Sequence, residues 1–218
     1  AFKPEPMRLY ADALNEGIRD RVARWSGTRF AFYPAIKQLT LDLAATSFLG
    51  IPWGPEAERI NKAFVDMVQA SIGVVRVPLP FTAMGRGVAG RKFLVEYFTK
   101  MVPERRASTG DDIFTQICQA KDEGGEYLSV EAIVDHMNFL MMAAHDTITS
   151  SVTSLVWLLG RHPEWQDRLC EEMLRVAPAG EGVGHNSLGE LELTEWAFKE
   201  ALRMIPPVPV IPRRALRD

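Results

Sequence analysis

Cysteine is scarce in this chain: only Cys118 and Cys170 occur among its 218 residues. The two lie far apart, and neither belongs to a CxxC pair or a Cys/His cluster, which argues against a zinc site and against a disulfide framework. We therefore expect no metal site built from residues of this chain. Two free thiols suit a reducing, cytoplasmic compartment.

An excess of charge and a long hydrophobic run are also missing. The net charge is −3 and the pI is near 5.9, so no basic field attracts nucleic acid and we expect no nucleic-acid partner. No run of about eighteen apolar residues could span a bilayer, because His145 and Asp146 interrupt the closest candidate. What remains is ordinary for a globular protein, with 47% hydrophobic residues and enough length to bury a substantial core.

Helical periodicity, punctuated by glycine and proline, runs through most of the sequence. Proline-rich residues 208–211 must be extended, and glycine- and proline-rich residues 73–90 predict a loop. We expect a mainly α fold with little β structure. The predicted helices cover approximately residues 7–25, 33–49, 56–71, 91–106, 111–121, 129–161, a segment beginning at Pro163, and 194–204.

An acid and an alcohol stand side by side within the long central helix, at Asp146 and Thr147. Ala143 and Ala144 lie about one turn earlier, and such small residues leave a shallow groove where a flat ligand could approach the backbone. The Thr147 hydroxyl can bond the carbonyl of Ala143, while Asp146 is rotated about 100° away from Thr147 around the helix. Taken alone, Thr147 could simply bond its own helix, and Asp146 could be a satisfied core or surface acid.

A second polar pair, Glu200 and Arg203, follows on the last predicted helix. Residues three apart share a helix face, so these side chains should meet. Taken alone, such a pair is usually an exposed ion pair of small energetic value.

The two segments together resemble the cytochrome P450 family. The sequence Ala-Ala-His-Asp-Thr at 143–147, followed by Leu-Leu-Gly-Arg-His-Pro-Glu at 158–164, is similar to the family's central helix and the start of the next one. Residues 198–213, which read Phe-Lys-Glu-Ala-Leu-Arg-Met-Ile-Pro-Pro-Val-Pro-Val-Ile-Pro-Arg, resemble its ExxR helix and the strand after it. One departure is Ile148, where a second threonine is common. The resemblance extends along essentially the whole chain.

The resemblance implies roles for the acid–alcohol pair and its neighbours. Ala143 and Ala144 would pack near haem and its bound oxygen. Thr147 would hydrogen-bond the iron-bound peroxo species, and Asp146 would help to relay protons to it.

Other residues take structural, cofactor and substrate roles in the same way. Glu200 and Arg203 would be a structural pair, and Arg213, or its neighbour Arg214, would bind a haem propionate. The candidate lining residues of an apolar substrate pocket are Phe139, Met142, Val208 and Val210.

The cysteine that would bind haem iron has no counterpart here, because neither Cys118 nor Cys170 stands in a glycine-rich loop after the ExxR helix. We therefore expect residues 1–218 to be a single partial domain, the middle portion of the fold, from a haem-thiolate monooxygenase. The parent would insert one oxygen atom of O2 into an apolar organic substrate, with electrons from NAD(P)H through a ferredoxin or a flavoprotein reductase. The fragment alone should be inactive.

Two other readings are open to test. The truncated chain could be a haem-free helical binding or interaction module that self-associates through apolar surface around Ala143 and Thr147 or through residues 208–211. A metal-dependent hydrolase using His136, His145 and Asp146 is disfavoured, because the two histidines face nearly opposite sides of one helix.

For location, we expect a soluble, bacterial-type cytoplasmic protein. No signal peptide opens the sequence, which begins at Ala1 rather than at a methionine. A membrane anchor in an N-terminal part that is missing here stays open.

Overall fold

The computed structural model of the chain describes residues 4–27, 29–178, 181–211 and 213–214. These residues form helices joined by short loops, with one isolated antiparallel bridge between Lys121 and Tyr127 and no strand. The expected mainly α fold is confirmed. The helices are α1 (Pro4–Val22), η1 (Ala23–Trp25), α2 (Phe32–Leu49), α3 (Pro55–Ile72), α4 (Ala83–Ala107), α5 (Ile113–Gln119), α6 (Val130–Arg161), α7 (Pro163–Val176), η2 (His185–Glu190) and α8 (Glu192–Met204).

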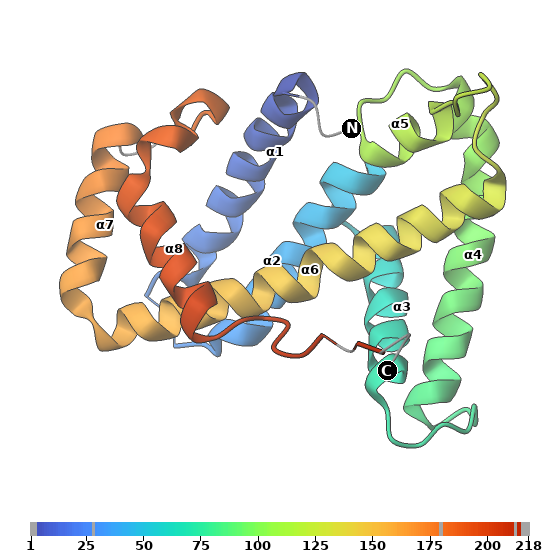
Figure 1. The fold of residues 1–218 in the computed structure, drawn as a ribbon, viewed down its shortest axis with the longest axis horizontal. Coiled ribbons are helices and arrows are strands. Elements are labelled where there is room, and N and C mark those ends of the chain that lie inside the picture. Colours follow the sequence, from blue (N-terminus) through green and yellow to red (C-terminus); the bar gives the residue numbers. More distant parts are fainter. Residues whose placement is uncertain (1–3, 28, 179–180, 212, 215–218) are drawn as a thin grey trace.

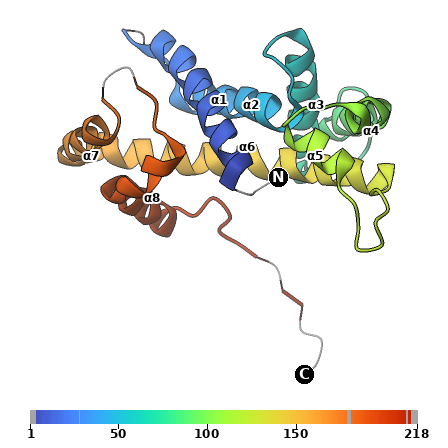
Figure 2. The same cartoon turned by 90° about the horizontal axis from the view of Figure 1, so that it is seen from above.

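Helix α6 crosses the whole molecule (Figure 1). Its 32 residues make a rod about 48 Å long at ~1.5 Å per residue. The side chain of Ser129 caps its start by accepting a hydrogen bond from the amide of Ala132 at 3.1 Å, as the sequence predicted. Helices α1 to α5 lie on one side of α6, and α8 with the segment after it lies on the other (Figure 2). One side of α6 is thus packed, and much of the other is uncovered.

The hydrophobic core fills the packed side, where α2 to α5 meet α6. Phe98 of α4 is fully buried, and its ring centroid lies 6.3 Å from that of Phe64 and 5.3 Å from that of Phe114. Met137 and Met141 of α6 are fully buried in the same core. Burial of each such side chain contributes about 1.5–3 kcal/mol, so this core fixes the first half of α6.

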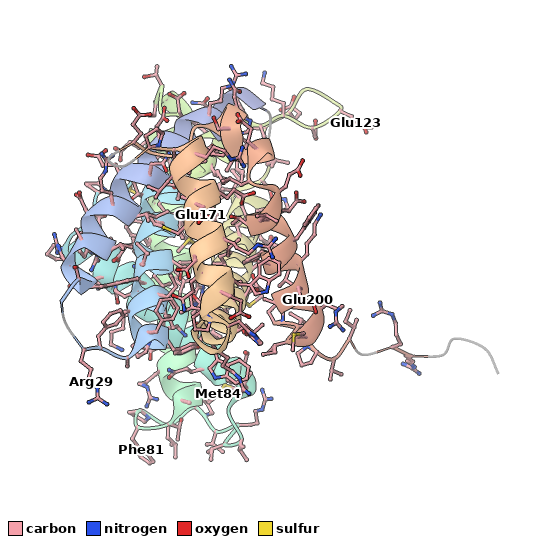
Figure 3. All side chains as sticks on the ribbon, turned by 90° about the vertical axis from the view of Figure 1, so that its left-hand side faces the viewer. Arg29, Phe81, Met84, Glu123, Glu171 and Glu200 are labelled. Atoms are coloured by element: carbon pink, nitrogen blue, oxygen red, sulfur yellow. The ribbon has the colours of Figure 1, made fainter. Side chains whose placement is uncertain are left out.

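Helix α4 begins eight residues earlier than predicted, so the expected loop over 73–90 is wrong for residues 83–90. The glycines that suggested a loop instead allow close contact with α3. A Cβ atom on Gly87 would lie 2.2 Å from the Cβ of Ala70, and one on Gly90 would lie 2.7 Å from the carbonyl oxygen of Ala63. Glycine here removes side-chain volume between two helices rather than permitting a turn. In the loop that connects α3 and α4, Phe81 projects into solvent (Figure 3).

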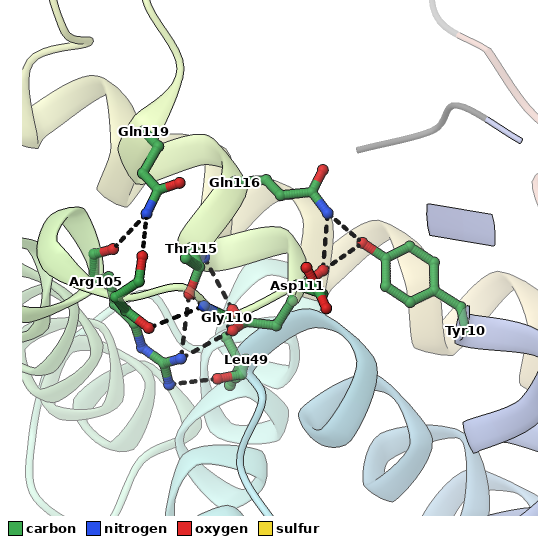
Figure 4. A network of polar contacts seen from close by, with 10 residues as sticks. Tyr10, Leu49, Arg105, Gly110, Asp111, Thr115, Gln116 and Gln119 are labelled. Carbon is green, nitrogen blue, oxygen red and sulfur yellow. Dashed lines mark hydrogen bonds and ion pairs between the residues drawn. The ribbon is translucent and has the colours of Figure 1, made fainter. Parts of the chain in front are cut away.

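A polar network ties α4 and α5 to the end of α2 (Figure 4). The Arg105 guanidinium donates from Nη1 to Oδ2 of Asp112 at 2.9 Å and from Nη2 to the carbonyl oxygen of Leu49 at 2.6 Å. The other carboxylate oxygen of Asp112 accepts the amide N–H of Thr115 at 2.9 Å, which caps α5. One arginine therefore neutralises a capping acid and satisfies a terminal carbonyl of another helix.

Helices α7 and α8 are joined by a carboxylate cap. Glu172 of α7 is buried and accepts hydrogen bonds from the amides of Leu193 and Thr194, both at 2.8 Å, and from the Thr194 hydroxyl at 2.7 Å. Burial opposes ionisation of Glu172, but these hydrogen bonds outweigh it and lower its pKa. Its neighbour Glu171 and Glu200 of α8 are exposed on the outer surface (Figure 3). Glu172 thus holds the first turn of α8 against α7.

Candidate functional site

Asp146 and Thr147 point to different sides of α6: Asp146 lies beside the packed side, and Thr147 lies on the uncovered side. Thr147 is exposed, and its hydroxyl donates to the carbonyl oxygen of Ala143 at 2.9 Å, which confirms the hydrogen bond predicted from the sequence. Ala143 and Ala144 are half-buried. Ser151 repeats the pattern by donating to the carbonyl oxygen of Thr147 at 2.7 Å. Thr147 and Ser151 thus each bond back to a carbonyl oxygen of their own helix.

The opposite face of α6 is packed against α2. Met141, His145 and Thr149, each four residues apart, are completely buried. The hydroxyl oxygens of Thr149 and of Thr40 on α2 lie 2.8 Å apart. This contact helps to fix the register of α6 on α2, because the Thr149 hydroxyl is completely buried and would be costly without a partner.

Asp146 lies at the border of this seam. One of its carboxylate oxygens, Oδ1, is 3.2 Å from Nζ of Lys37 on α2 and 3.2 Å from Nε2 of His145. The Asp146 side chain is 33% exposed, so it reaches solvent while it contacts a fully buried imidazole. Asp146 therefore lies between solvent and the buried face of α6.

The expected substrate-lining residues are exposed in this chain. Phe139 is 60% exposed, Met142 40%, Val208 55% and Val210 75%. An apolar cleft of about 520 Å³ lies elsewhere, between the end of α6, α7 and α8, and none of these four residues lines it. Its walls are Leu155, Leu158, Leu159, His162, Trp165, Trp196, Ala197, Glu200, Ala201 and Met204. Within the described residues, Phe139 and Met142 are not enclosed with Val208 and Val210.

Glu200 and Arg203 form the expected pair on α8. Arg203 donates from Nε and Nη2 to the two carboxylate oxygens at 2.7 and 2.6 Å. This hydrogen bond lowers the pKa of Glu200. Both side chains are more than half exposed, so the pair orders one stretch of α8 and contributes little to stability here. Arg213 and Arg214 are exposed on the segment after α8.

The two cysteines differ in environment. Cys118 on α5 is completely buried, and burial raises the pKa of its thiol to about 11, against the opposing charges of Arg106 and Arg105. Cys170 on α7 is exposed. A buried neutral thiol is a poor metal ligand, because metals bind the thiolate. Cys118 is therefore a packing residue of the hydrophobic core.

Sequence reasoning missed the partners of these groups. Lys37 is 109 residues from Asp146 in sequence, as is Thr40 from Thr149. Nothing in the local pattern of α2 distinguishes Lys37 from an ordinary surface lysine. These contacts could have been found only by knowing which face of α2 packs against which face of α6. None of the helices in the described part of the chain combines the length and the apolar character that a membrane-spanning segment needs.

The chain has clear relatives. The sequence profile described as cytochrome P450 matches residues 9–218. Cytochrome P450 136 of Mycobacterium tuberculosis is 41% identical over 225 residues, which cover 100% of this chain and 45% of that protein. Pentalenene oxygenase of Streptomyces avermitilis is 30% identical, with 100% and 50% covered.

The fold has relatives among solved structures too. Retinoic acid bound cyanobacterial CYP120A1 superposes with a TM-score of 0.83 at 24% identity, over 94% of this chain and 47% of that one. The chain thus spans about half the length of the proteins it matches. Its profile match, its relatives and its helical arrangement agree, and the chain belongs to the cytochrome P450 family.

Proposed function

We propose that the chain is the middle portion of a haem-thiolate monooxygenase. The parent enzyme inserts one oxygen atom of O2 into an apolar organic substrate. It takes electrons from NAD(P)H through a ferredoxin or a flavoprotein reductase. The observation that carries this proposal is the pair Asp146–Thr147 on α6, with the alcohol exposed and the acid in contact with Lys37. Two relatives carry the names pentalenene oxygenase and beta-amyrin 28-monooxygenase.

Members of the family bind haem, and the residues of this chain fit one side of that group. Helix α6 has a side that α1 to α5 leave uncovered (Figure 2), and Thr147 is exposed beside the small residues Ala143 and Ala144. Arg213 supplies a planar cation suited to a propionate. Neither cysteine of this chain suits the role of iron ligand. We propose that the ligating thiolate comes from the part of the protein that the relatives have beyond the region matched here.

Haem, when bound, supplies the activation of O2, and this chain supplies the proton-handling groups. In our proposal the Thr147 hydroxyl, which already donates to the carbonyl of Ala143, accepts a hydrogen bond through its free lone pairs and orients a water or substrate oxygen. The Asp146 carboxylate takes a proton from the solvent side near Lys37 and delivers it toward Thr147. Phe139, Met142, Val208 and Val210 line an apolar pocket once the rest of the protein covers them.

The iron-ligand part of the proposal is tested with carbon monoxide. Haem is added to residues 1–218 and to the whole protein, and the spectrum of reduced iron with carbon monoxide is recorded. We expect a thiolate-type band from the whole protein and none from residues 1–218. A thiolate-type band from residues 1–218 would show that Cys118 or Cys170 binds iron, which would overturn the assignment.

A haem-free binding module is the second candidate, because several large apolar side chains remain exposed. Trp157, Trp196 and Met204 are each more than half exposed, and Trp196 and Met204 stand in the walls of the apolar cleft. Such surface tends to find a partner. The candidate predicts self-association of residues 1–218 with rising concentration. Sedimentation velocity that finds a compact monomer at high concentration would remove it.

A further inference from the structure

The end of α3 and the loop that connects it to α4 carry a run of exposed, large apolar side chains. Val74 is 95% exposed and Phe81 78%. The loop lies at the edge of the molecule, where α3 ends and α4 begins (Figure 1), and Phe81 points away from the rest of the protein (Figure 3). A continuous exposed apolar surface marks an interaction site. The side chains that form it, together called the apolar tip, are Ile72, Val74, Val75, Val77, Leu79 and Phe81.

Hydrogen bonds tie the apolar tip to the start of α4. The Thr82 hydroxyl lies 2.7 Å from the carbonyl oxygen of Val77 and 2.8 Å from that of Leu79, and its one hydrogen serves both. The same hydroxyl caps α4 by accepting the amide N–H of Gly85 at 3.0 Å. A Cβ atom on Gly85 would lie 1.9 Å from the carbonyl oxygen of Leu79. The glycine therefore lets the loop fold back onto the first turn of α4.

Much of the backbone of the apolar tip satisfies its polar groups internally. Pro78 and Pro80 have no N–H to satisfy. The amide of Leu79 donates to the carbonyl oxygen of Val77 at 2.9 Å, and that of Thr82 donates to the carbonyl oxygen of Leu79 at 3.0 Å. Moving an unpaired backbone group out of water is costly. This pairing therefore lowers the cost of bringing the tip into an apolar phase.

Positive charge accompanies the apolar tip. Residues 67–95 contain no acid and four basic residues, in a chain whose net charge is −3. Arg86 and Lys92 contact acids of α3 and α4 at 3.5 and 3.9 Å. Arg76 stands within the tip itself, is exposed, and makes no ion pair in the described part of the chain. Exposed apolar side chains thus surround a cation whose charge no neighbour balances.

We propose that the apolar tip docks the protein onto an anionic lipid surface. The apolar side chains enter the boundary between headgroups and acyl chains, and Arg76 stays among the anionic headgroups. A bilayer accepts a projecting tip without a matching hollow, whereas a protein partner must supply a complementary surface. The docking does not rest on the proposed function. Where that function holds, docking places the enzyme beside the phase in which an apolar substrate dissolves.

The test is partitioning of the whole protein onto lipid vesicles, measured by sedimentation of the vesicles. One set is phosphatidylcholine alone, and the other contains phosphatidylglycerol as well. We expect binding to the anionic set. The double variant Val74→Ser/Phe81→Ser should bind at least about tenfold more weakly, because two large apolar groups no longer leave water. Arg76→Gln should weaken binding to the anionic set by about fivefold and leave binding to phosphatidylcholine unchanged.

The matched controls lie on α7, at the far end of the molecule from the apolar tip (Figure 1). Leu174 and Arg168 are exposed there, so Leu174→Ser and Arg168→Gln remove one apolar and one basic side chain from the surface. Both should bind vesicles as the wild type does. All substituted side chains are exposed, so the variants should fold, and thermal unfolding checks this. A double variant that binds as tightly as Leu174→Ser overturns the proposal.

Fluorescence quenching by brominated acyl chains locates the contact even if another part of the protein also binds the membrane. Phe81→Trp should gain quenching over the wild type, and Leu174→Trp should gain none. Equal quenching of the two overturns the proposal. A wild type that binds neither vesicle set also overturns it, and sedimentation velocity without lipid then shows whether a second copy covers the tip. Absence of a thiolate-type carbon monoxide spectrum would refute the proposed function and leave the docking intact.

Discussion

Replacement of Arg105 by methionine should destabilise the protein strongly. The Arg105 side chain is 15% exposed and its partner Asp112 8%, so the change leaves a largely buried carboxylate without its cation. The carbonyl of Leu49 loses its donor as well. Breaking a buried ion pair costs about 3–5 kcal/mol. Because Asp112 keeps two hydrogen bonds from Thr115, we expect the lower end, about 3 kcal/mol.

Urea unfolding of the whole protein, followed by both fluorescence and circular dichroism, measures this loss. Coincident transitions justify a single free energy of unfolding. The matched control is Lys62→Met, which breaks a surface ion pair whose lysine is 71% exposed and should change stability by less than about 0.5 kcal/mol. If Arg105→Met loses no more than the control, the network in Figure 4 does not stabilise the fold and the reasoning is wrong.

Three further outcomes are expected. The pKa of Glu172 is lowered in the folded protein. The ionised carboxylate therefore contributes its full stability above the unfolded pKa of about 4.3, and this contribution is lost as pH falls through the folded pKa. The difference in melting temperature between wild type and Glu172→Gln should accordingly shrink on acidification. Gly87→Ala should cost about 1–3 kcal/mol by overpacking, whereas Gly160→Ala, with open space around its Cβ position, should gain up to about 1 kcal/mol; equal melting temperatures would contradict both. The proposed function further predicts that, in the whole protein, Thr147→Ala wastes more NAD(P)H than Thr147→Ser, measured as product formed per NAD(P)H consumed.

The sequence located most helices because their ends carry strong local signals. Ser129 caps α6, Pro163 begins α7, and Gly50 ends α2 in the left-handed conformation with a φ of 61°. The same residue type misled the reading at Gly87 and Gly90, where close approach of α3 required the absence of a side chain. Local rules do not distinguish these two uses of glycine.

The site was predictable to the extent that it lies on one helix. Thr147 and its bond to Ala143 follow from helical spacing alone. The contact of Asp146 with Lys37 depends on how α2 and α6 pack, a tertiary fact that no periodicity encodes. The roles of Arg213, Val208 and Val210 remain predictions, because they depend on parts of the fold outside this chain.

The continuous helix α6 also decides where this protein can vary in length. Insertion of a single residue before Thr147 would rotate everything after it by about 100° and advance it by about 1.5 Å. The buried stripe through Met141, His145 and Thr149 would then lose its match with α2, and Thr147 would leave its face. The turn at Gly124–Gly125 carries no such constraint, since it is exposed. Relatives should therefore differ in length at that turn and keep α6 free of insertions and deletions.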